Sequence, residues 1–264
     1  MSTVAIASLG ASPGVSTCAV ALALSWSQPV LLVEADVSKP SSVVAGLMQG
    51  SLPADAGLMG VAQSSGMHAV SEQDVWDFAV SLNQSEDDEV GRWLLPALSE
   101  PAAARGMRSF WSDLLRLLRG MSNQPLDTLI DLGRIENRTG RDDLVTDTDH
   151  LLIVVRSDLA SVAAAKAHLP EIEQDRASRG ASGTISLVVV EDMAQKVSSA
   201  EIAKFLGAPV VGRIPHAPVP AARYSGGRPV RARALRGFNR SVAAVEASVH
   251  QQIDKRRMMM EGKA

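Results

Sequence analysis

A short segment near the N-terminus has the residue types of a loop that binds phosphate. The apolar run 3–9 predicts a strand, and Gly10 to Thr17 follow it with small and hydroxyl-bearing residues. In such loops backbone N–H groups hold the anion, a lysine neutralises it, and a hydroxyl group ligates Mg²⁺. Gly14, Ser16 and Thr17 are present here, but Val15 stands where the lysine is expected. The segment therefore predicts a phosphate cradle without its main charge.

Two later apolar runs carry carboxylates at their ends. Residues 29–36 end at Asp36, and residues 126–133 contain Asp131. Continuous apolar runs of this length are typical of strands buried on both faces of a parallel sheet. We expect Asp36 and Asp131 near the loop, where they would join Ser16 in holding Mg²⁺ if nucleotide binds. In the alternative interpretation, Asp131 only caps the turn after its strand, and Ser16 and Thr17 only cap a helix.

These three segments, in this order, resemble the ParA/MinD superfamily of deviant Walker A ATPases, which includes septum-site, plasmid-partition and TadZ/CpaE-like pilus-localising proteins. The resemblance places the family's loop on eight residues and both of its lysines on uncharged positions. Those eight residues would hold the cofactor: Gly10 (in place of the signature lysine), Ala11, Ser12, Pro13, Gly14, Val15 (in place of the second lysine), Ser16 and Thr17. It also implies that Ser16, Asp36 and Asp131 are the Mg²⁺ ligands, and that Asp36 and Asp131 are the catalytic candidates if the protein is active.

The order of the remaining segments predicts the same α/β fold, a mostly parallel central sheet with helices on both faces. Further strands are expected at 151–155, 185–190 and 210–214, and further helices at 15–26, 160–176 and 198–206. Residues 93–96 predict a short strand, and residues 72–82 and 109–121 predict helices, the second capped by Ser109. Where the family often has an adenine-contacting Asn, after the strand at 185–190, this chain has Glu191 and Asp192.

The 264-residue chain has the length and the 46% apolar content of one α/β domain, which we place at 1–254, followed by a basic, Met-rich, disordered tail at 255–264. Its single cysteine, Cys18, excludes an internal disulfide and a cysteine-ligated metal centre within one chain. The five histidines lack metal-ligand spacing. The sequence has no signal-peptide pattern and no apolar run of about 20 residues, so we expect a cytoplasmic protein without membrane contact.

Charge is distributed unevenly along the chain. Residues 1–91 contain one basic residue, Lys39, against ten carboxylates, whereas residues 202–245 contain eight basic residues and no carboxylate. Six arginines of this second stretch form a candidate partner surface for phosphate groups or acidic proteins: Arg223, Arg228, Arg231, Arg233, Arg236 and Arg240. A solvated or internally paired surface is the alternative. The apolar stripe of the last helix, at 235–259, predicts docking against the sheet or another subunit.

Loss of both lysines should weaken ATP or ADP binding and remove the charge that stabilises phosphoryl transfer. The sequence thus favours a non-catalytic scaffold or positioning protein, a pseudo-ATPase that acts as a homodimer and through a protein partner. Two alternatives stay open. One is a partition or localisation ATPase, active or partner-stimulated, in which an arginine such as Arg213 or Arg223 replaces the lysine. The other is a nonspecific DNA-binding protein that uses the arginine surface.

Overall fold

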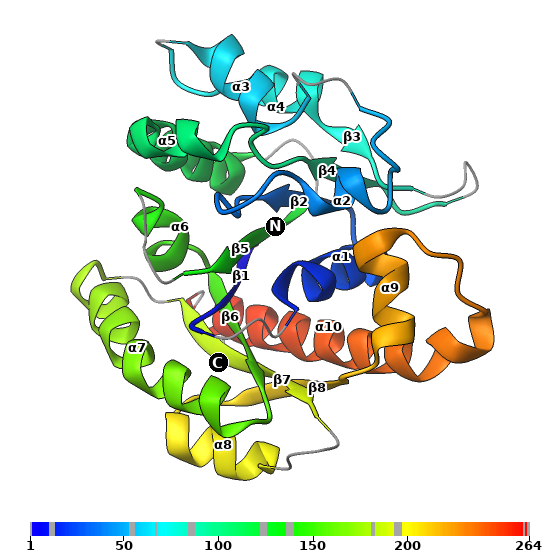
Figure 1. The fold of residues 1–264 in the computed structure, drawn as a ribbon. Coiled ribbons are helices and arrows are strands. Elements are labelled where there is room, and N and C mark those ends of the chain that lie inside the picture. The colour runs from blue at the N-terminus through cyan, green and yellow to red at the C-terminus, as the bar shows by residue number, and fades with distance from the viewer. Residues whose placement is uncertain are drawn as a thin grey trace.

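Eight strands form one sheet in the order β3-β4-β2-β5-β1-β6-β7-β8 (Figure 1). The computed structural model describes residues 2–10, 14–52, 56–66, 68–83, 88–121, 126–135, 140–180, 183–192, 197–260 and 262. All neighbouring strands are parallel except the edge pair β3 and β4. The strands are β1 (Thr3–Ser8), β2 (Val30–Glu34), β3 (Val80–Ser81), β4 (Arg92–Leu95), β5 (Asp127–Arg134), β6 (His150–Arg156), β7 (Thr184–Glu191) and β8 (Val210–Pro215).

Helices cover both faces of this sheet. They are α1 (Val15–Ser25), α2 (Ser42–Ala45), α3 (Leu58–Ser65), α4 (Glu72–Phe78), α5 (Arg108–Gly120), α6 (Asp142–Thr146), α7 (Leu159–Ser178), α8 (Ser199–Leu206), α9 (Pro218–Gly226) and α10 (Ala232–Met260), with a 3₁₀ turn, η1, at Pro101–Gly106. Figure 1 shows α5 to α8 on one side of the sheet and α1, α9 and α10 on the other. The predicted α/β fold with a mostly parallel sheet is confirmed.

The alternation of strand side chains divides the apolar interior into two layers. On β1, Ala5 and Ala7 face the layer that contains α5 and α7, while Val4 and Ile6 face the layer that contains α1 and α10. All four side chains are fully buried. The continuous apolar runs of the sequence are thus explained by burial on both faces. Because the strands pair in parallel, their carboxyl ends lie at one edge of the sheet.

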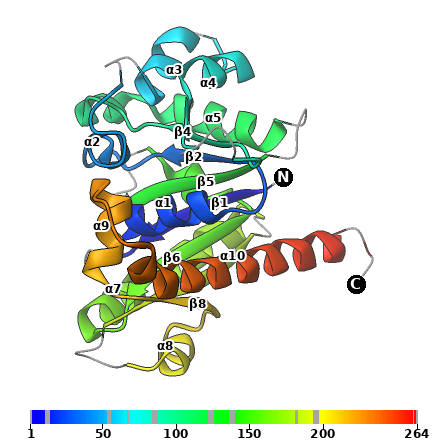
Figure 2. The same cartoon turned by 90° about the vertical axis from the view of Figure 1, so that its right-hand side faces the viewer.

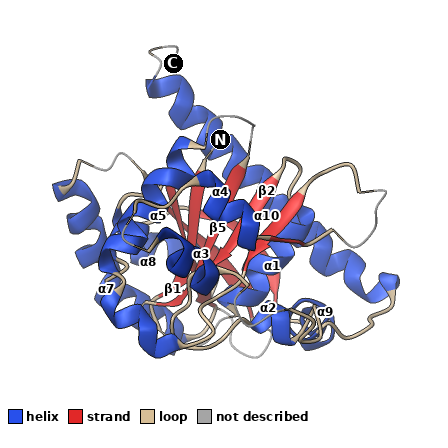
Figure 3. Cartoon of the chain, turned by 90° about the horizontal axis from the view of Figure 1, so that it is seen from above, coloured by secondary structure: helices blue, strands red, loops and turns tan. Residues whose placement is uncertain are grey.

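Helix α10 docks on the sheet through its apolar stripe, as predicted. Val242, Val245 and Val249 have no exposed surface, and a side chain at Gly212 on β8 would place its Cβ 2.4 Å from Val245. Figures 2 and 3 show the C-terminal part of the helix extending past the sheet. Helical structure continues to Met260, where we expected a disordered tail from residue 255. Lys, Arg and Met favour helix, so the helix continues beyond the docked stripe, which ends at Ile253; Met258 and Met259 are exposed.

Other local differences have physical causes. Helix α5 begins at Arg108, so Ser109 does not cap it. The helix expected at 72–82 ends at Phe78, and the chain then forms the antiparallel edge strand β3. Within the described part of the chain, no helix is both long enough and apolar enough to cross a membrane.

Glu246 of α10 links the helix to the segment before β2 and forms an ion pair within the helix that should depend on pH. The Glu246 carboxylate accepts a hydrogen bond from the Ser27 amide and lies 3.5 Å from Nε2 of His250. The hydrogen bond with Glu246 raises the pKa of His250, as do the charges of Asp127 and Asp254.

We expect His250→Gln to lower the free energy of unfolding most at acidic pH. A raised histidine pKa stabilises the fold fully below the unfolded value of 6.5, and this contribution disappears as pH rises through the folded value. Denaturant titrations between pH 5 and 9 measure it, with the exposed His168→Gln as the control. A difference between wild type and His250→Gln that grows with pH would contradict this account.

Candidate functional site

The N-terminus of α1 forms one wall of the candidate site. Gly14 precedes the helix in the left-handed conformation, at φ +92°, and its carbonyl accepts the Cys18 amide at 2.9 Å. No side chain of the described residues caps this end, so Ser16 and Thr17 are not capping residues. The amides of a helix N-terminus and the helix dipole favour an anion here. Of the predicted loop, Ala11, Ser12 and Pro13 lie outside the described residues.

A pocket of about 300 Å³ opens at this helix end, at the carboxyl edge of the sheet. Its walls come from the predicted loop, from the segment after β2 and from the end of β5. The lining residues are Ser8, Gly14, Val15, Ser16, Thr17, Asp36, Ser38, Lys39, Gly133 and Arg134. The structure therefore brings together Ser16, Asp36 and the loop as predicted, and adds two cations that sequence reasoning did not place there.

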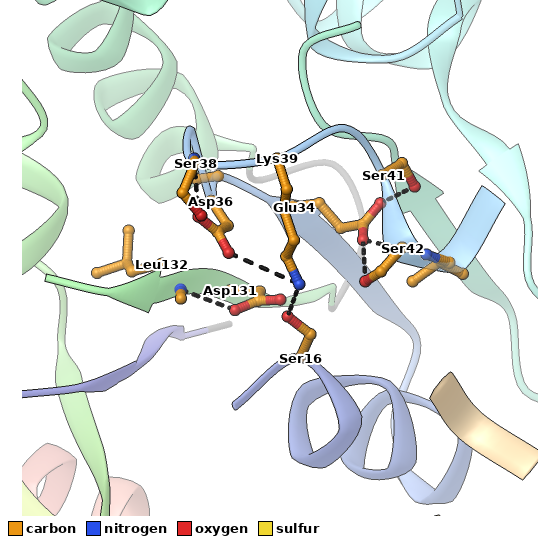
Figure 4. A network of polar contacts seen from close by, with 12 residues as sticks. Ser16, Glu34, Asp36, Ser38, Lys39, Ser41, Ser42, Asp131 and Leu132 are labelled. Carbon is orange, nitrogen blue, oxygen red and sulfur yellow. Dashed lines mark hydrogen bonds and ion pairs between the residues drawn. The ribbon is translucent and has the colours of Figure 1, made fainter. Parts of the chain in front are cut away.

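Lys39 points into the predicted metal position. Its ammonium group donates a hydrogen bond to Oγ of Ser16 at 2.9 Å and lies 3.7 Å from Oδ2 of Asp36 (Figure 4). The Asp36 carboxylate also accepts the amide and hydroxyl of Ser38, at 3.0 and 2.6 Å. Two of the three predicted Mg²⁺ ligands thus contact one ammonium group.

Gly133 permits the approach of Asp36 to the end of β5. Its backbone has φ +61°, and an added Cβ would lie 2.3 Å from Oδ2 of Asp36. Only glycine combines this conformation with this distance. The Gly133 amide donates to Oδ1 of Asp131 at 2.9 Å, which ties the turn to the third predicted ligand.

Asp131 is almost completely buried, with 1% of its surface exposed. The pKa of Asp131 is raised to about 6, chiefly by burial and also by the charges of Glu34 and Asp36, against the opposing effect of hydrogen bonds from Ser16 and Gly133. Burial and the charge of Asp131 raise the pKa of the Cys18 thiol to about 12, so this cysteine is not a nucleophile. Asp131 therefore makes more than the turn-capping contact of the alternative interpretation.

A third carboxylate, Glu34, faces Asp131 across the pairing of β2 and β5. It accepts hydrogen bonds from the hydroxyls of Ser41 and Ser42 and from the amide of Val43, at the start of α2. Burial nevertheless raises the pKa of Glu34. Its role is to fix the segment from β2 to α2, which carries Asp36 and Lys39.

Arg141 positions the two predicted metal-ligand segments. Its guanidinium group, 3% exposed, donates to the carbonyl oxygens of Ala35 and Leu132, the residues adjacent to Asp36 and Asp131. Burial lowers the pKa of Arg141, while the charges of Asp36 and Asp131 raise it. This residue was not predicted from the sequence, because the residues around Arg141 give no sign that its side chain contacts the ends of β2 and β5, which are remote along the chain.

The site as it stands does not fit Mg²⁺. This ion prefers near-ideal octahedral coordination by oxygen at 2.0–2.1 Å. Here the Ser16 hydroxyl accepts from an ammonium group, and a second cation beside it would be repelled. Among the described residues, no group of three His, Cys, Asp or Glu side chains is arranged to hold a metal.

A second, smaller pocket of about 140 Å³ adjoins the first through Gly14 and Thr17. Its apolar walls include Val190, Ile214 and Phe238. Its polar residues are linked to one another: Nη2 of Arg156 lies 2.6 Å from Nε2 of His216, and Asp192 lies within 4.0 Å of both side chains. Asp192 therefore contacts two basic side chains at the position where the family resemblance led us to look for an adenine-binding Asn.

The two arginines considered as substitutes for the missing lysine lie elsewhere. Arg213 pairs with Glu191 at 3.2 Å on the surface of β8, and Arg223 lines a different pocket beside Leu47 and Met48. The cations that line the phosphate pocket are instead Lys39 and Arg134. Of the arginine surface, Arg228, Arg231, Arg233, Arg236 and Arg240 are exposed or half-buried around the start of α10, and Arg223 is half-buried on α9.

Comparison with solved structures decides the fold. MinD from Aquifex aeolicus aligns with a TM-score of 0.70 at 17% sequence identity, over 95% of this chain and 98% of that one. The chain has the ParA/MinD fold. Two further structures are similar to the same extent. A ParA family ATPase from Chlorobium tepidum aligns with a TM-score of 0.67 at 15% identity, over 93% of this chain and 97% of that one. Apo McdA from Cyanothece aligns with a TM-score of 0.70 at 19% identity, over 94% of this chain and 99% of that one. The sequence matches neither a protein family nor a curated protein.

The position that the family resemblance assigns to the signature lysine has no room for a side chain. Gly10 stands there, and a Cβ at this position would lie 2.4 Å from the Cβ of Ala164 on α7. Any side chain at position 10 requires the backbone or α7 to shift. Position 10 is therefore closely packed against α7.

Proposed function

We propose that this protein is a non-catalytic member of the ParA/MinD group, a pseudo-ATPase that positions other components through dimerisation and partner binding. The observation that carries the proposal is the contact of Lys39 with Ser16 and Asp36. It offsets the charge of Asp36 and occupies the Ser16 hydroxyl without metal. Val15 and the crowding at Gly10 support the proposal. Neither residue at the two expected lysine positions carries a positive charge that could stabilise a transferring phosphoryl group.

The proposal predicts no phosphate release from ATP. Removal of one electrostatic donor typically lowers the rate about 10²- to 10³-fold, and two are absent here. Phosphate release by purified protein with Mg²⁺ and ATP should therefore match that of the Asp131→Asn variant. A release that this substitution abolishes would establish the rival function, a partition or localisation ATPase that uses Lys39 or Arg134 in place of the lysines.

Dimerisation through the loop face is the second part of the proposal. Leu159 begins α7 at the carboxyl edge of the sheet and is 72% exposed. An apolar side chain this exposed, on the helix that packs against Gly10, is suited to a contact between two copies. We expect Leu159→Glu to shift the protein toward monomer in sedimentation. Phe205→Glu is the control: Phe205 is 53% exposed and lies on α8, which precedes β8, at the opposite edge of the sheet. Equal effects of both substitutions would contradict a dimer through the loop face.

The arginine surface favours DNA as a second candidate partner. Contacts between arginine and phosphate release counterions, so binding should weaken steeply as salt rises. Fluorescence anisotropy with a random-sequence duplex at low and physiological salt measures this. Wild type should bind more tightly than a variant with Arg231, Arg233 and Arg236 changed to Gln, and absence of binding at low salt would remove this candidate.

A further inference from the structure

We infer that Lys39 takes the place of the divalent cation, so that the pocket binds a phosphate chain without metal. This inference concerns the same site as the proposed non-catalytic function and rests on it. The relevant chemistry is a di- or triphosphate chain, whether free or part of a nucleotide. Mg²⁺ should neither be required for binding nor occupy the site.

The position of the ammonium group carries this inference. It donates to Ser16 at the first turn of α1 and lies 3.7 Å from Asp36 (Figure 4). The Lys39 side chain, on the loop after β2, thus reaches the N-terminus of α1. With 42% of its side chain exposed, Lys39 also borders the open part of the pocket. An anion seated against the α1 amides would meet this cation directly.

The surrounding charges explain why the cation of this site is a lysine side chain of the protein and not a metal ion that exchanges with solvent. Asp36 and Asp131 are nearly buried, and an unneutralised pair would repel a phosphate chain. Lys39 offsets Asp36, while Asp131 accepts the amide of Gly133. Arg134 lines the same pocket as a second positive group. The site thus contains its own cations, supplied by segments outside the loop.

The test is calorimetric titration of tripolyphosphate and of ADP, each in EDTA and in excess Mg²⁺. We expect wild type to bind in EDTA, with no gain from Mg²⁺. Lys39→Met should lose about tenfold or more in EDTA, as for loss of one charge-assisted hydrogen bond. Lys204→Met, the same change at an exposed position of α8, should bind like wild type. Equal affinities for both probes identify the phosphate chain as the recognised group, and tighter ADP binding adds a nucleoside contact; both support the inference.

Binding of Mn²⁺ alone, followed by the electron paramagnetic resonance of the free ion, gives an independent readout. Wild type should not bind Mn²⁺, whereas Lys39→Met should, because its carboxylates have lost their ammonium partner. Three results would overturn the inference: anion binding that requires Mg²⁺, no binding of either probe in either buffer, or a Lys39→Met variant that behaves as wild type. Phosphate release is measured separately, so failure of the non-catalytic proposal is recognised independently of failure here.

Discussion

Val15→Lys should raise the affinity for ATP and ADP by about ten- to a hundredfold. Val15 begins α1 and lines the phosphate pocket. A lysine there would add a charge-assisted hydrogen bond to phosphate, which contributes on the order of 1.5 to 3 kcal/mol. Calorimetric titration of each nucleotide, with and without Mg²⁺, into both proteins measures the change.

Val15→Met controls for the added length without charge and should leave nucleotide affinity unchanged. Gly10→Lys should not reproduce the gain, because its Cβ would collide with Ala164. If Val15→Lys binds nucleotide no better than wild type, the cradle is not formed as described, and the missing lysine is not what limits binding.

Asp131→Asn should stabilise the fold by about 3 kcal/mol at pH 7. Burial raises the pKa of Asp131 from 3.8 to about 6, so its ionisation opposes folding at neutral pH. When the pKa of a group is higher by one in the folded protein than in the unfolded chain, its ionisation costs about 1.4 kcal/mol of stability. The gain should fall as pH decreases from 6 toward 3.8, where the native carboxyl is already protonated.

Denaturant titrations of both proteins at pH 4 and pH 7 measure this difference. Asp77→Asn, on the exposed face of α4, is the control and should change the free energy of unfolding by less than about 0.5 kcal/mol. A destabilising effect of Asp131→Asn at pH 7 would show that its ionised form is required in the folded protein, and the charge balance of the site would need revision.

The central strands and their carboxylates were predictable because they depend on local patterns. Asp36 and Asp131 follow or lie within continuous apolar runs, which identify buried parallel strands directly. The boundaries of β5, β7 and α8 differ from the predicted ones by at most one residue at each end. The edge of the sheet was harder to predict, because β3 has two residues and α3 lacks a capping side chain among the described residues.

The residues that define the chemistry of the pocket were not predictable in the same way. Lys39 follows a strand by five positions, and only its isolation among ten carboxylates in the first 91 residues singled it out. Its contact with Ser16 depends on how the loop after β2 returns to α1, which Glu34 fixes through Ser41 and Ser42. Arg141 reaches its carbonyl partners across the sheet edge. Such contacts are tertiary and leave no periodic signal.

Sedimentation velocity without nucleotide and with Mg²⁺ and ATP tests the central claim most directly. In a pseudo-ATPase whose metal position is filled by Lys39, assembly does not depend on bound Mg²⁺ and ATP. We therefore expect a dimer in both conditions, with the same distribution of species. A monomer that becomes a dimer only when Mg²⁺ and ATP are added would contradict this expectation and would show that the pocket still works as a nucleotide switch.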